Sequence, residues 1–455
     1  MQIFLSSLPA LSENKWLRLA LVTALYAAQG IQMGLMMVAI PAYLAGQQAS
    51  AATIGGFIGA SLLPWSLKIL TGPIMDRYSF LPMGRRRPWV LFGLFGAIVG
   101  YLVMGLIDRP LEHFILFTVA AVVVSSFTAF LDVAIDGMAI DIFPLDEQPQ
   151  ANSFMWGGKV IGSALTTGGA AWTLKTYGLE VTCFVAFGSS VLFFIMPLLL
   201  RERPGERIFP WSAGEASATS LDMKLDSWKE IIGSLVKVIF LPASVLLALV
   251  SFLHGITYGL FDAVMPMISV QKLGWTDQAF SNLAAVSGLV AGIVGIFSGK
   301  YLVQWFGRKT SLTYLMILLI CAAIAMGMAS SLWSHELTIQ SYVLMTYLLR
   351  TLFLIILFAT AMAICWLPVA ATQFALYMAI ANLGISTGAA LLGPLKSQFT
   401  YSQILFVFAL FLLISIAILS RIRLEEHLAS LEALDVHHLQ SDDPSERSSP
   451  VAVVA

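Results

Sequence analysis

Long apolar runs alternate with short polar breaks along almost the whole chain, and charged residues, Pro or Gly mark the breaks. A bilayer core about 30 Å thick is crossed by about 20 helical residues, so runs of this length predict membrane-spanning helices. The pattern predicts twelve spans, at residues 16–44, 53–75, 89–107, 113–143, 152–174, 179–200, 242–270, 277–303, 310–330, 338–366, 372–395 and 404–420.

One polar stretch, after the sixth span, is much longer than the others and divides the spans into two equal sets. Residues 1–200 are expected to form one six-helix bundle and residues 242–423 a second. Residues 201–241 are expected to be a cytoplasmic linker ending in an amphipathic helix, Trp228 to Phe240, on the membrane surface. Residues 424–455 are expected to be a disordered cytoplasmic tail that begins as a short acidic helix, because SDDPSERSSP has a disordered composition.

The two halves carry similar segments. Gly307–Lys309 follows Gly84–Arg86 by about 223 residues, and Ser386–Gly388 follows Thr166–Gly168 by 220 residues. A duplicated six-helix unit is the architecture of transporters that bind their substrate between the halves near the bilayer midplane. Chance similarity between two apolar helical halves is the alternative explanation.

Composition supports a membrane protein. The chain has 455 residues, of which 58% are hydrophobic and only 11% are charged, whereas soluble domains have about 25% charged residues. The net charge of −1 gives no reason to expect nucleic acid binding. The three cysteines lie far apart inside apolar runs, so neither a metal site nor a redox pair is expected. No GxSxG, HExxH or phosphate-binding glycine loop appears, so an enzyme is not expected.

Lysine and arginine predict the orientation, because cytoplasmic loops retain them. One side of the bundle has few of these residues, namely Arg109, Lys175, Lys272 and Lys396. The other side has Lys15, Arg18, Arg77, Arg85, Arg86, Arg87, Arg201, Arg203, Arg207, Lys224, Lys229, Arg308, Lys309, Arg421 and Arg423. A multi-pass, monomeric protein of the inner membrane with both termini in the cytoplasm is therefore expected.

Several ionisable residues fall inside predicted spans, where charge is costly and therefore suggests function. Asp132 and Asp136 lie one turn apart on the fourth span. At about 1.5 Å per residue, Asp136, Lys68 and Lys159 lie about 10–12 Å from the cytosolic ends of their spans, which predicts a charge cluster. Other polar residues are expected nearer the midplane or lining the cavity: Asp132, His254, Arg350, Gln29, Gln32, Tyr258 and Asn382.

These residues suggest two roles and one structural alternative. Proton coupling is assigned to Asp132 and Asp136, as carboxylates inside the membrane, and to His254, because histidine titrates near neutrality. Substrate binding is assigned to Gln29, Gln32, Lys159, Tyr258, Arg350 and Asn382. In the alternative, the carboxylate of Asp136 and a lysine form a fixed ion pair, His254 is an ordinary core residue, and the neutral polar residues join helices by hydrogen bonds.

The hairpin Leu67–Arg87 joins the second and third spans. Its pattern is carried by Gly72, Asp76, Arg77, Gly84, Arg85 and Arg86. This pattern resembles the cytoplasmic-loop signature of the major facilitator superfamily. The fourth span, with Asp132, Asp136 and Asp141, resembles the branch that holds the AmpG-type muropeptide permeases and the acetyl-CoA transporters. The resemblance covers roughly residues 53–200 and implies that the six hairpin residues act as a conformational latch.

The resemblance implies an all-α major facilitator fold of twelve transmembrane helices in two pseudo-symmetric bundles. It also implies a secondary active transporter that imports a polar, anionic, muropeptide-like solute with protons. The proton gradient would be the energy source and no cofactor would be needed. A siderophore or acyl-CoA permease is the alternative within the superfamily. A sensor or assembly factor that does not transport is the alternative class.

Overall fold

The computed structural model describes residues 10–47, 51–223 and 228–441, and the described part consists of helices joined by loops without any strand. The first half contains η1(Leu11–Glu13), α2(Lys15–Gln32), η2(Met33–Ala39), α3(Ile40–Gly46), α4(Ala51–Leu67), η3(Lys68–Leu70), α5(Thr71–Arg77), η4(Leu81–Met83), α6(Arg87–Leu106), α7(Phe114–Ile142) and α8(Gln148–Leu199). The linker contains α9(Ala218–Asp222) and α10(Trp228–Ile239). The second half contains α11(Pro242–Pro266), η5(Met267–Lys272), α12(Asp277–Phe306), α13(Arg308–Met328), η6(Ser330–Leu332), α14(Glu336–Ala363), η7(Leu367–Val369), α15(Ala370–Gln398) and α16(Tyr401–Ser420), and α17(Leu424–Ser441) follows.

Ten helices in the described part are long and apolar enough to cross a membrane. One of them, α8, contains two crossings, because Gly178 has a φ of 87° and reverses the chain. The hydroxyl of Thr182 donates to that of Thr173 across this reversal at 2.9 Å. The second predicted span is also present, but it is broken into α4, the short 3-10 turn η3 and α5. The twelve predicted crossings are thus confirmed.

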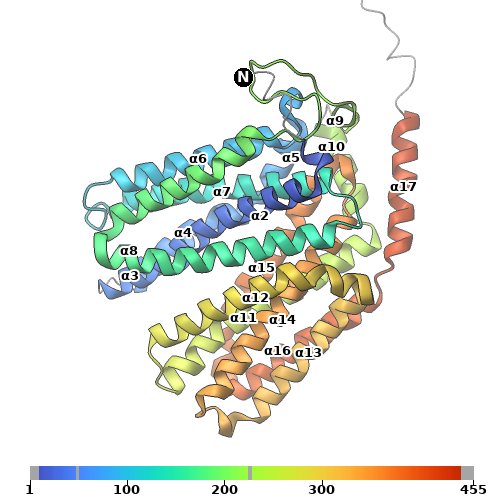
Figure 1. Ribbon diagram of the computed structural model, residues 1–455. Helices are drawn as coiled ribbons and strands as arrows, with labels where there is room; N and C mark the ends of the chain where they lie inside the picture. The colour runs from blue at the N-terminus through green and yellow to red at the C-terminus, as the bar shows by residue number, and fades with distance from the viewer. Residues whose placement is uncertain (1–9, 48–50, 224–227, 442–455) are drawn as a thin grey trace, which may run out of the picture.

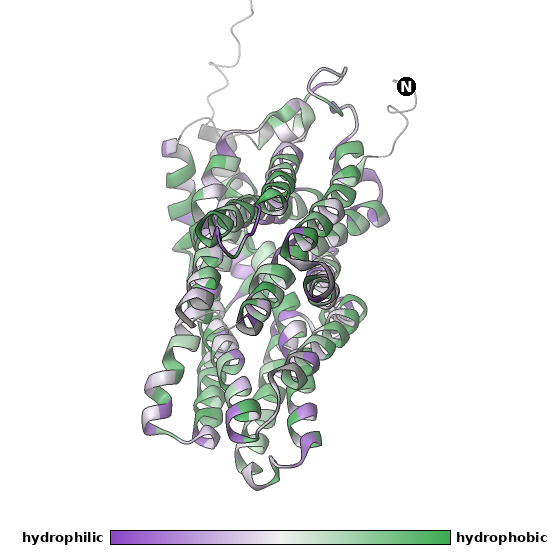
Figure 2. Cartoon of the chain, turned by 90° about the vertical axis from the view of Figure 1, so that its left-hand side faces the viewer, coloured by the Kyte–Doolittle hydropathy of each residue, from purple (hydrophilic) through white to green (hydrophobic). Residues whose placement is uncertain are grey.

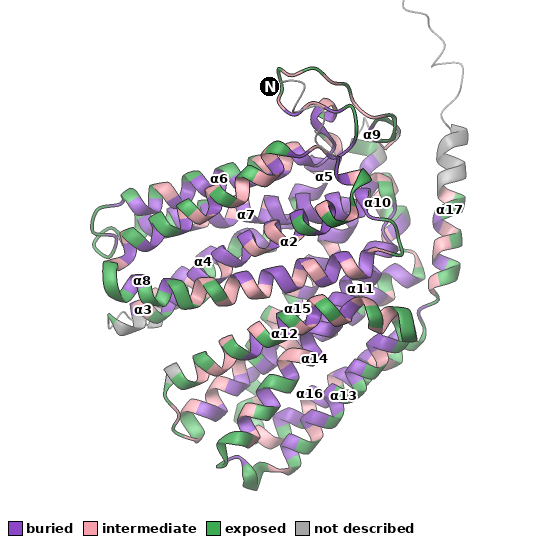
Figure 3. Cartoon of the chain, viewed as in Figure 1, coloured by how far each residue is buried: buried purple, intermediate pink, exposed green. Residues whose placement is uncertain are grey.

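The crossings of the first half and those of the second half form two bundles, which lie one above the other in Figure 1. Apolar residues dominate the helices in Figure 2, and Figure 3 shows exposed positions along their outer surfaces. Large apolar side chains such as Ile115 and Phe297 are 82% and 70% exposed, which suits a surface that faces lipid. Both α10 and α17 lie at the same end of the bundle. We call this end, which also holds Arg85, Arg203 and Arg308, the basic end.

The two halves repeat one helix pair that is joined by small residues. In the first half, Gly30 and Gly34 of α2 lie against the backbone of α8, where a Cβ on Gly30 would come within 2.7 Å of the Lys159 carbonyl. In the second half, Gly255 and Gly259 of α11 lie as closely against α15. Small residues let membrane helices approach closely. This equivalence supports the duplication that the sequence predicts.

The sequence predicts a short acidic helix at the start of the tail, and the structure has a longer one there, α17 over residues 424–441. This helix is held in place because Leu431 is buried with Ile231 and Val238 of α10 and with Trp366. His427 contributes a contact between its Nε2 and the carbonyl of Ile364 at 3.0 Å. Residues 442–455 of the tail lie outside the described residues.

Candidate substrate and proton site

A buried charge cluster joins three helical segments of the first half. The Nζ of Lys68 lies 2.8 Å from Oδ2 of Asp132, and the Nζ of Lys159 lies 3.7 Å from Oδ1 of the same residue. Asp132 and Lys68 are fully buried. Asp136 lies one turn further along α7, and its Oδ1 is hydrogen-bonded to the hydroxyl of Tyr26 on α2. A carboxylate shared by two ammonium groups can remain charged without water, because each buried charge has a partner.

This arrangement corrects one prediction. The sequence placed Asp136 at the depth of both lysines, whereas the structure pairs the lysines with Asp132. Depth was counted along the backbone, but helical side chains lean toward the N-terminus of their helix. Lys68 follows a helix that begins at the end opposite the basic end, so its long side chain leans toward the middle of the bundle. The ion pair considered in the structural alternative therefore exists with a different carboxylate.

Three aromatic rings surround the ammonium group of Lys159. Its Nζ lies 4.8 Å from the ring centroid of Trp65, 5.2 Å from that of Trp156 and 5.6 Å from that of Tyr26. Aromatic faces attract cations, and the attraction increases where water is excluded. The rings therefore stabilise a cation whose ion pair with Asp132 is long, and they present flat surfaces beside it.

Some buried polar atoms of this region have no hydrogen-bond partner among the described residues. They include Oδ1 of Asp132, Oε1 of Gln32 and Oδ2 of Asp136. The other end of the Gln32 amide donates to the hydroxyl of Ser125 at 3.0 Å. A buried polar atom without a partner costs free energy. Such atoms beside a charge cluster are typical of a site that takes up water, a proton or a ligand.

The second half holds a separate charged pair. Nη1 of Arg350 on α14 lies 2.6 Å from Oδ1 of Asp262 on α11. The guanidinium also lies 3.6 Å from the ring centroid of Tyr258 and 4.6 Å from that of Tyr347. Arg350 is thus a paired, ring-packed cation, and the pairing with Asp262 was not predicted. The Asp262 side chain is 42% exposed, so the pair can still be reached by a ligand.

His254 and Asn382 lie in the same half. His254 is buried, its ring packs 4.2 Å from that of Phe353, and neither ring nitrogen has a hydrogen-bond partner among the described residues. Asn382 is half-buried on α15. Both positions suit a polar lining, and neither joins the lysine cluster by a hydrogen bond or ion pair in the described part.

The basic end is held together by Asp76. Its carboxylate accepts hydrogen bonds from Nη2 of Arg86 at 2.7 Å and from the backbone N–H and the hydroxyl of Thr372 at 3.1 and 2.7 Å. Thr372 lies in the first turn of α15, where the helix dipole favours a negative charge. A Cβ on Gly72 would lie 2.6 Å from the Cα of Thr372, so only glycine permits this approach. The hairpin therefore ties the first half to the second.

The arginines of the hairpin extend these contacts. Arg85 donates to the carbonyl of Pro368 at 3.0 Å, and Nε of Arg86 lies 3.0 Å from Oδ2 of Asp141. Glu202 accepts the backbone N–H groups of Arg85, Arg86 and Arg87. The other two residues of the predicted latch, Gly84 and Arg77, contact different parts of the linker.

Gly84 has a φ of 104°, and a Cβ there would lie 2.7 Å from the Glu202 carboxyl carbon. Arg77 lies over the rings of Tyr78 and Trp228, at 5.3 and 5.5 Å from the centroids. Sequence reasoning missed Thr372 and Glu202 as partners. A single threonine near a helix start and a glutamate in a polar loop give no distinctive signal.

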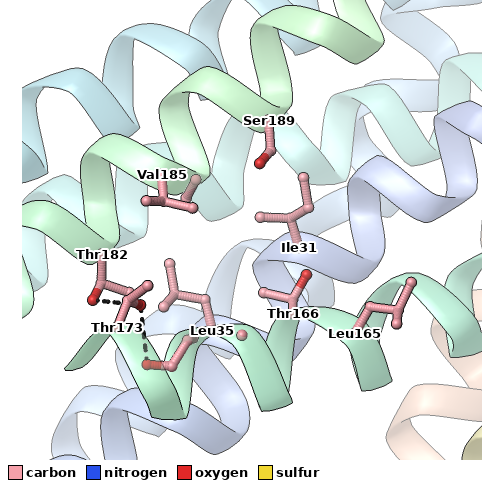
Figure 4. A pocket seen from close by; sticks show the side chains of 11 residues that line it. Ile31, Leu35, Leu165, Thr166, Thr173, Thr182, Val185 and Ser189 are labelled. Atoms are coloured by element: carbon pink, nitrogen blue, oxygen red, sulfur yellow. Dashed lines mark hydrogen bonds between the residues drawn. The ribbon is translucent and has the colours of Figure 1, made fainter. Parts of the chain in front are cut away.

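A cavity of about 230 Å³ lies elsewhere in the first half, between α2, η2 and both arms of α8 (Figure 4). Its lining is mostly apolar, with hydroxyls from Thr166, Thr173, Thr182 and Ser189. It shares no residue with the charge cluster. We therefore place the candidate site at the cluster rather than in this cavity.

Contacts between the halves close the basic end. Trp156 stacks on Phe358 with ring centroids 5.3 Å apart, and Nη2 of Arg308 donates to the carbonyl of Leu145 at 3.0 Å. Together with the bonds of Asp76, these contacts join both bundles on one side of the charge cluster. Two six-helix bundles with buried charges and a closed end define a membrane transporter fold.

Comparison with known proteins identifies the family. The model of the Major Facilitator Superfamily matches residues 22–373, and the chain therefore belongs to this superfamily of transporters. The anhydromuropeptide permease of Escherichia coli K12 is 23% identical over 373 residues, which are 81% of this chain and 72% of the relative. A putative transporter AmpG 4 of Rickettsia conorii is 24% identical over 257 residues, covering 54% of this chain and 58% of the relative. The resemblance to AmpG-type permeases is confirmed.

Solved structures show the same fold. The transporter FucP in its outward conformation has a TM-score of 0.68 at 11% identity and covers 89% of this chain and 98% of its own. A bacterial homologue of the iron transporter ferroportin, in an outward-facing state, has a TM-score of 0.65 at 13% identity and covers 90% and 99%. At these identities the likeness establishes the fold alone.

Proposed function

We propose that the chain is a proton-coupled importer of a polar, anionic solute, with a muropeptide as the first candidate. The observation that carries this proposal is the buried cluster in which Lys68 and Lys159 share the carboxylate of Asp132 beside Asp136. A protein that only senses or assembles has no need of such charges inside a membrane bundle, where they are costly.

The charge balance of the cluster supports proton coupling. With both aspartates ionised, two negative charges balance the two lysines. A proton on Asp136 leaves one positive charge in excess, and a buried unpaired charge is strongly unfavourable. An anionic group of the solute restores the balance, so the proton and the anion are favoured together. Asp132 remains the fixed partner of the lysines in this scheme, and Asp136 carries the proton.

The surroundings of Lys159 support a solute with flat or ring-shaped polar parts. Tyr26, Trp65 and Trp156 present ring faces beside the ammonium group, and the Gln29 amide adds a polar group beside Asp132. Arg350 offers a second cation in the other half. The name of the Escherichia coli relative supports an anhydromuropeptide as the solute.

Alternating access is supported by the contacts at the basic end. In the proposed orientation this end faces the cytoplasm, where positively charged loops are retained. Breaking the bonds of Asp76 to Thr372 and Arg86 would open the site to the cytoplasm. Both termini would then be cytoplasmic and the membrane would be the inner membrane.

The proposal is tested by uptake into proteoliposomes with an imposed pH gradient. An anhydromuropeptide, a siderophore and an acyl-CoA are offered separately, and internal solute is measured by mass spectrometry. We expect accumulation of the anhydromuropeptide. Lys159→Gln should abolish it, whereas Lys175→Gln, which removes the same charge from an exposed position of α8 near its reversal, should not. Failure of all three solutes to accumulate would contradict transport of this class.

A further inference from the structure

The linker helix α10 has two apolar faces. On the inner face, Ile231 and Val238 are fully buried and pack with Trp366 and Val369. On the outer face, Ile232 and Val236 of α10 and Phe240, which directly follows the helix and donates its backbone N–H to the carbonyl of Val236, are spaced four residues apart and are 56%, 48% and 73% exposed. Residues four apart lie above one another on a helix. The outer face is therefore a continuous apolar stripe that the protein itself leaves uncovered.

Two lysines border this stripe. Lys229 and Lys237 are exposed, and they lie on either side of Gly233 at the same four-residue spacing. They therefore form a row next to the apolar stripe. Lysine keeps its charge at the headgroup level while its methylene groups rest on apolar surface. An apolar stripe bordered by lysines is typical of a helix that lies in a membrane interface.

The position of α10 fixes the depth of the stripe. The helix ends at Ile239, and the membrane-spanning α11 begins at Pro242. Val245 and Leu249 of α11 are 39% and 45% exposed, so the apolar surface continues from α10 onto a crossing helix. Phe240 thus lies at the point where the chain enters the bilayer.

We propose that the outer face of α10 binds the anionic phospholipid surface of the leaflet at the basic end. Three apolar side chains are too few for a stable protein interface, which buries about 800 Å² per partner. The lysines match the negative surface of a leaflet that contains anionic lipid. Lipid is therefore the occupant that both the apolar stripe and the charges fit.

The inner face of α10 packs on residues that belong to the closed basic end. Trp366 and Val369, which pack on Ile231 and Val238, flank the two residues whose carbonyls accept hydrogen bonds from Arg85. Lipid that holds α10 in place therefore also stabilises the segment from Trp366 to Val369, to which Arg85 donates hydrogen bonds. Anionic lipid is expected to favour the state in which the basic end is closed.

A spin label tests the position of the outer face. Val236→Cys is introduced into the full chain after Cys183, Cys321 and Cys365 are changed to alanine, and the labelled protein is placed in nanodiscs that contain phosphatidylglycerol. We expect collisions with oxygen and protection from a water-soluble nickel complex. A control label at Lys175→Cys should collide with the nickel complex. Equal nickel access at both positions would overturn the proposal. Spin–spin broadening that disappears on dilution with unlabelled protein would also overturn it, because it would show that a second copy of the chain covers the face.

A second measurement tests the charges. Native mass spectrometry counts the phosphatidylglycerol and phosphatidylcholine molecules retained by the protein. At about 1 kcal/mol per lysine near a surface, Lys229→Gln with Lys237→Gln should reduce the preference for phosphatidylglycerol by up to ~30-fold. The matched pair Lys175→Gln with Lys396→Gln, at the opposite end, should leave it unchanged. An unchanged preference in the first pair contradicts the proposal.

Discussion

At the scale of single residues, Asp132 is the position on which the buried charges depend. It is the shared ion-pair partner of Lys68 and Lys159. Its neighbour Asp136 has one oxygen bonded to Tyr26 and one without a partner in the described structure. Two carboxylates one turn apart therefore differ in environment, and this difference is the basis for assigning them a structural and a proton-carrying role.

Asp132→Asn should destabilise the protein strongly. Removal of one partner from a buried ion pair costs about 3–5 kcal/mol, because the other charge stays buried without compensation. We expect a clearly lower midpoint of thermal unfolding in detergent. Adding Lys68→Met should recover much of the loss, since one unpaired cation is removed. The exposed Asp108→Asn is the control, and a wild-type midpoint for Asp132→Asn alone would show that the shared pairing does not hold.

The sequence identified the ionisable residues but not all their partners. Asp132, Asp136, Lys68 and Lys159 were found because charges are rare in apolar runs. Which lysine meets which aspartate depends on the direction of side chains and on the break at η3. The depth of a residue was predicted by counting residues from the end of its span, and this count includes neither the side-chain direction nor the break. The partner of Arg350 was missed for a similar reason, because its pairing with Asp262 depends on how side chains of two different helices are directed.

At the scale of elements, the helices at the basic end depend on one another. The apolar pattern predicted the crossing helices well, since helices are the structure that satisfies every backbone group in lipid. It predicted less well the elements outside the bilayer. The helix α17 is longer than the short helix expected at the start of the tail, because it packs on α10 and Trp366, and such tertiary contacts are not visible in local composition.

Truncation after Arg423 should loosen α10. Without α17, the buried side chains Ile231, Val238 and Trp366 lose the apolar contact with Leu431. We expect faster hydrogen exchange in residues 228–239 and a lower thermal midpoint. Truncation after Ser441, which retains the whole helix, is the matched control. Equal exchange in the two truncated proteins would mean that α17 does not support the linker helix.

The linker should also respond to pH through Glu206. Burial, together with the nearby Glu202, raises the pKa of Glu206 from 4.5 to about 7. Since the folded state holds this proton more tightly than the unfolded state, the linker is most stable below the unfolded pKa and loses stability as pH rises to about 7. Protection factors from hydrogen exchange in residues 201–217 should fall over this range. Glu206→Gln should remove the dependence, and the exposed Glu215→Gln should retain it.

At the scale of the whole molecule, two bundles are joined at the basic end by few strong bonds. Asp76 contributes several of these, and its partners come from both halves. A state held by such local contacts can be opened without unfolding either bundle. The sequence predicted this hairpin and its motif, but it could not reveal that the structure is closed at this end, because both states of a transporter share one sequence.

Asp76→Asn should shift the molecule toward opening at the basic end. The variant loses the charged bond to Arg86 and weakens the interaction with the start of α15. Cys365 is buried near this junction, 6% exposed, and reports the opening. We expect its labelling by a maleimide to accelerate several-fold, while buried Cys183 remains protected. Asp108→Asn at the opposite end is the control, and an unchanged rate for Cys365 would contradict a role of Asp76 in closure.

Proton movement during solute uptake tests the central claim most directly. Proteoliposomes that contain a trapped pH dye receive an anhydromuropeptide from outside, without any imposed gradient. Our account predicts that the interior acidifies as solute enters, and that Asp136→Asn abolishes the acidification while exchange of labelled for unlabelled solute continues. Solute entry without acidification in the wild-type protein, or unchanged acidification in Asp136→Asn, would contradict the account.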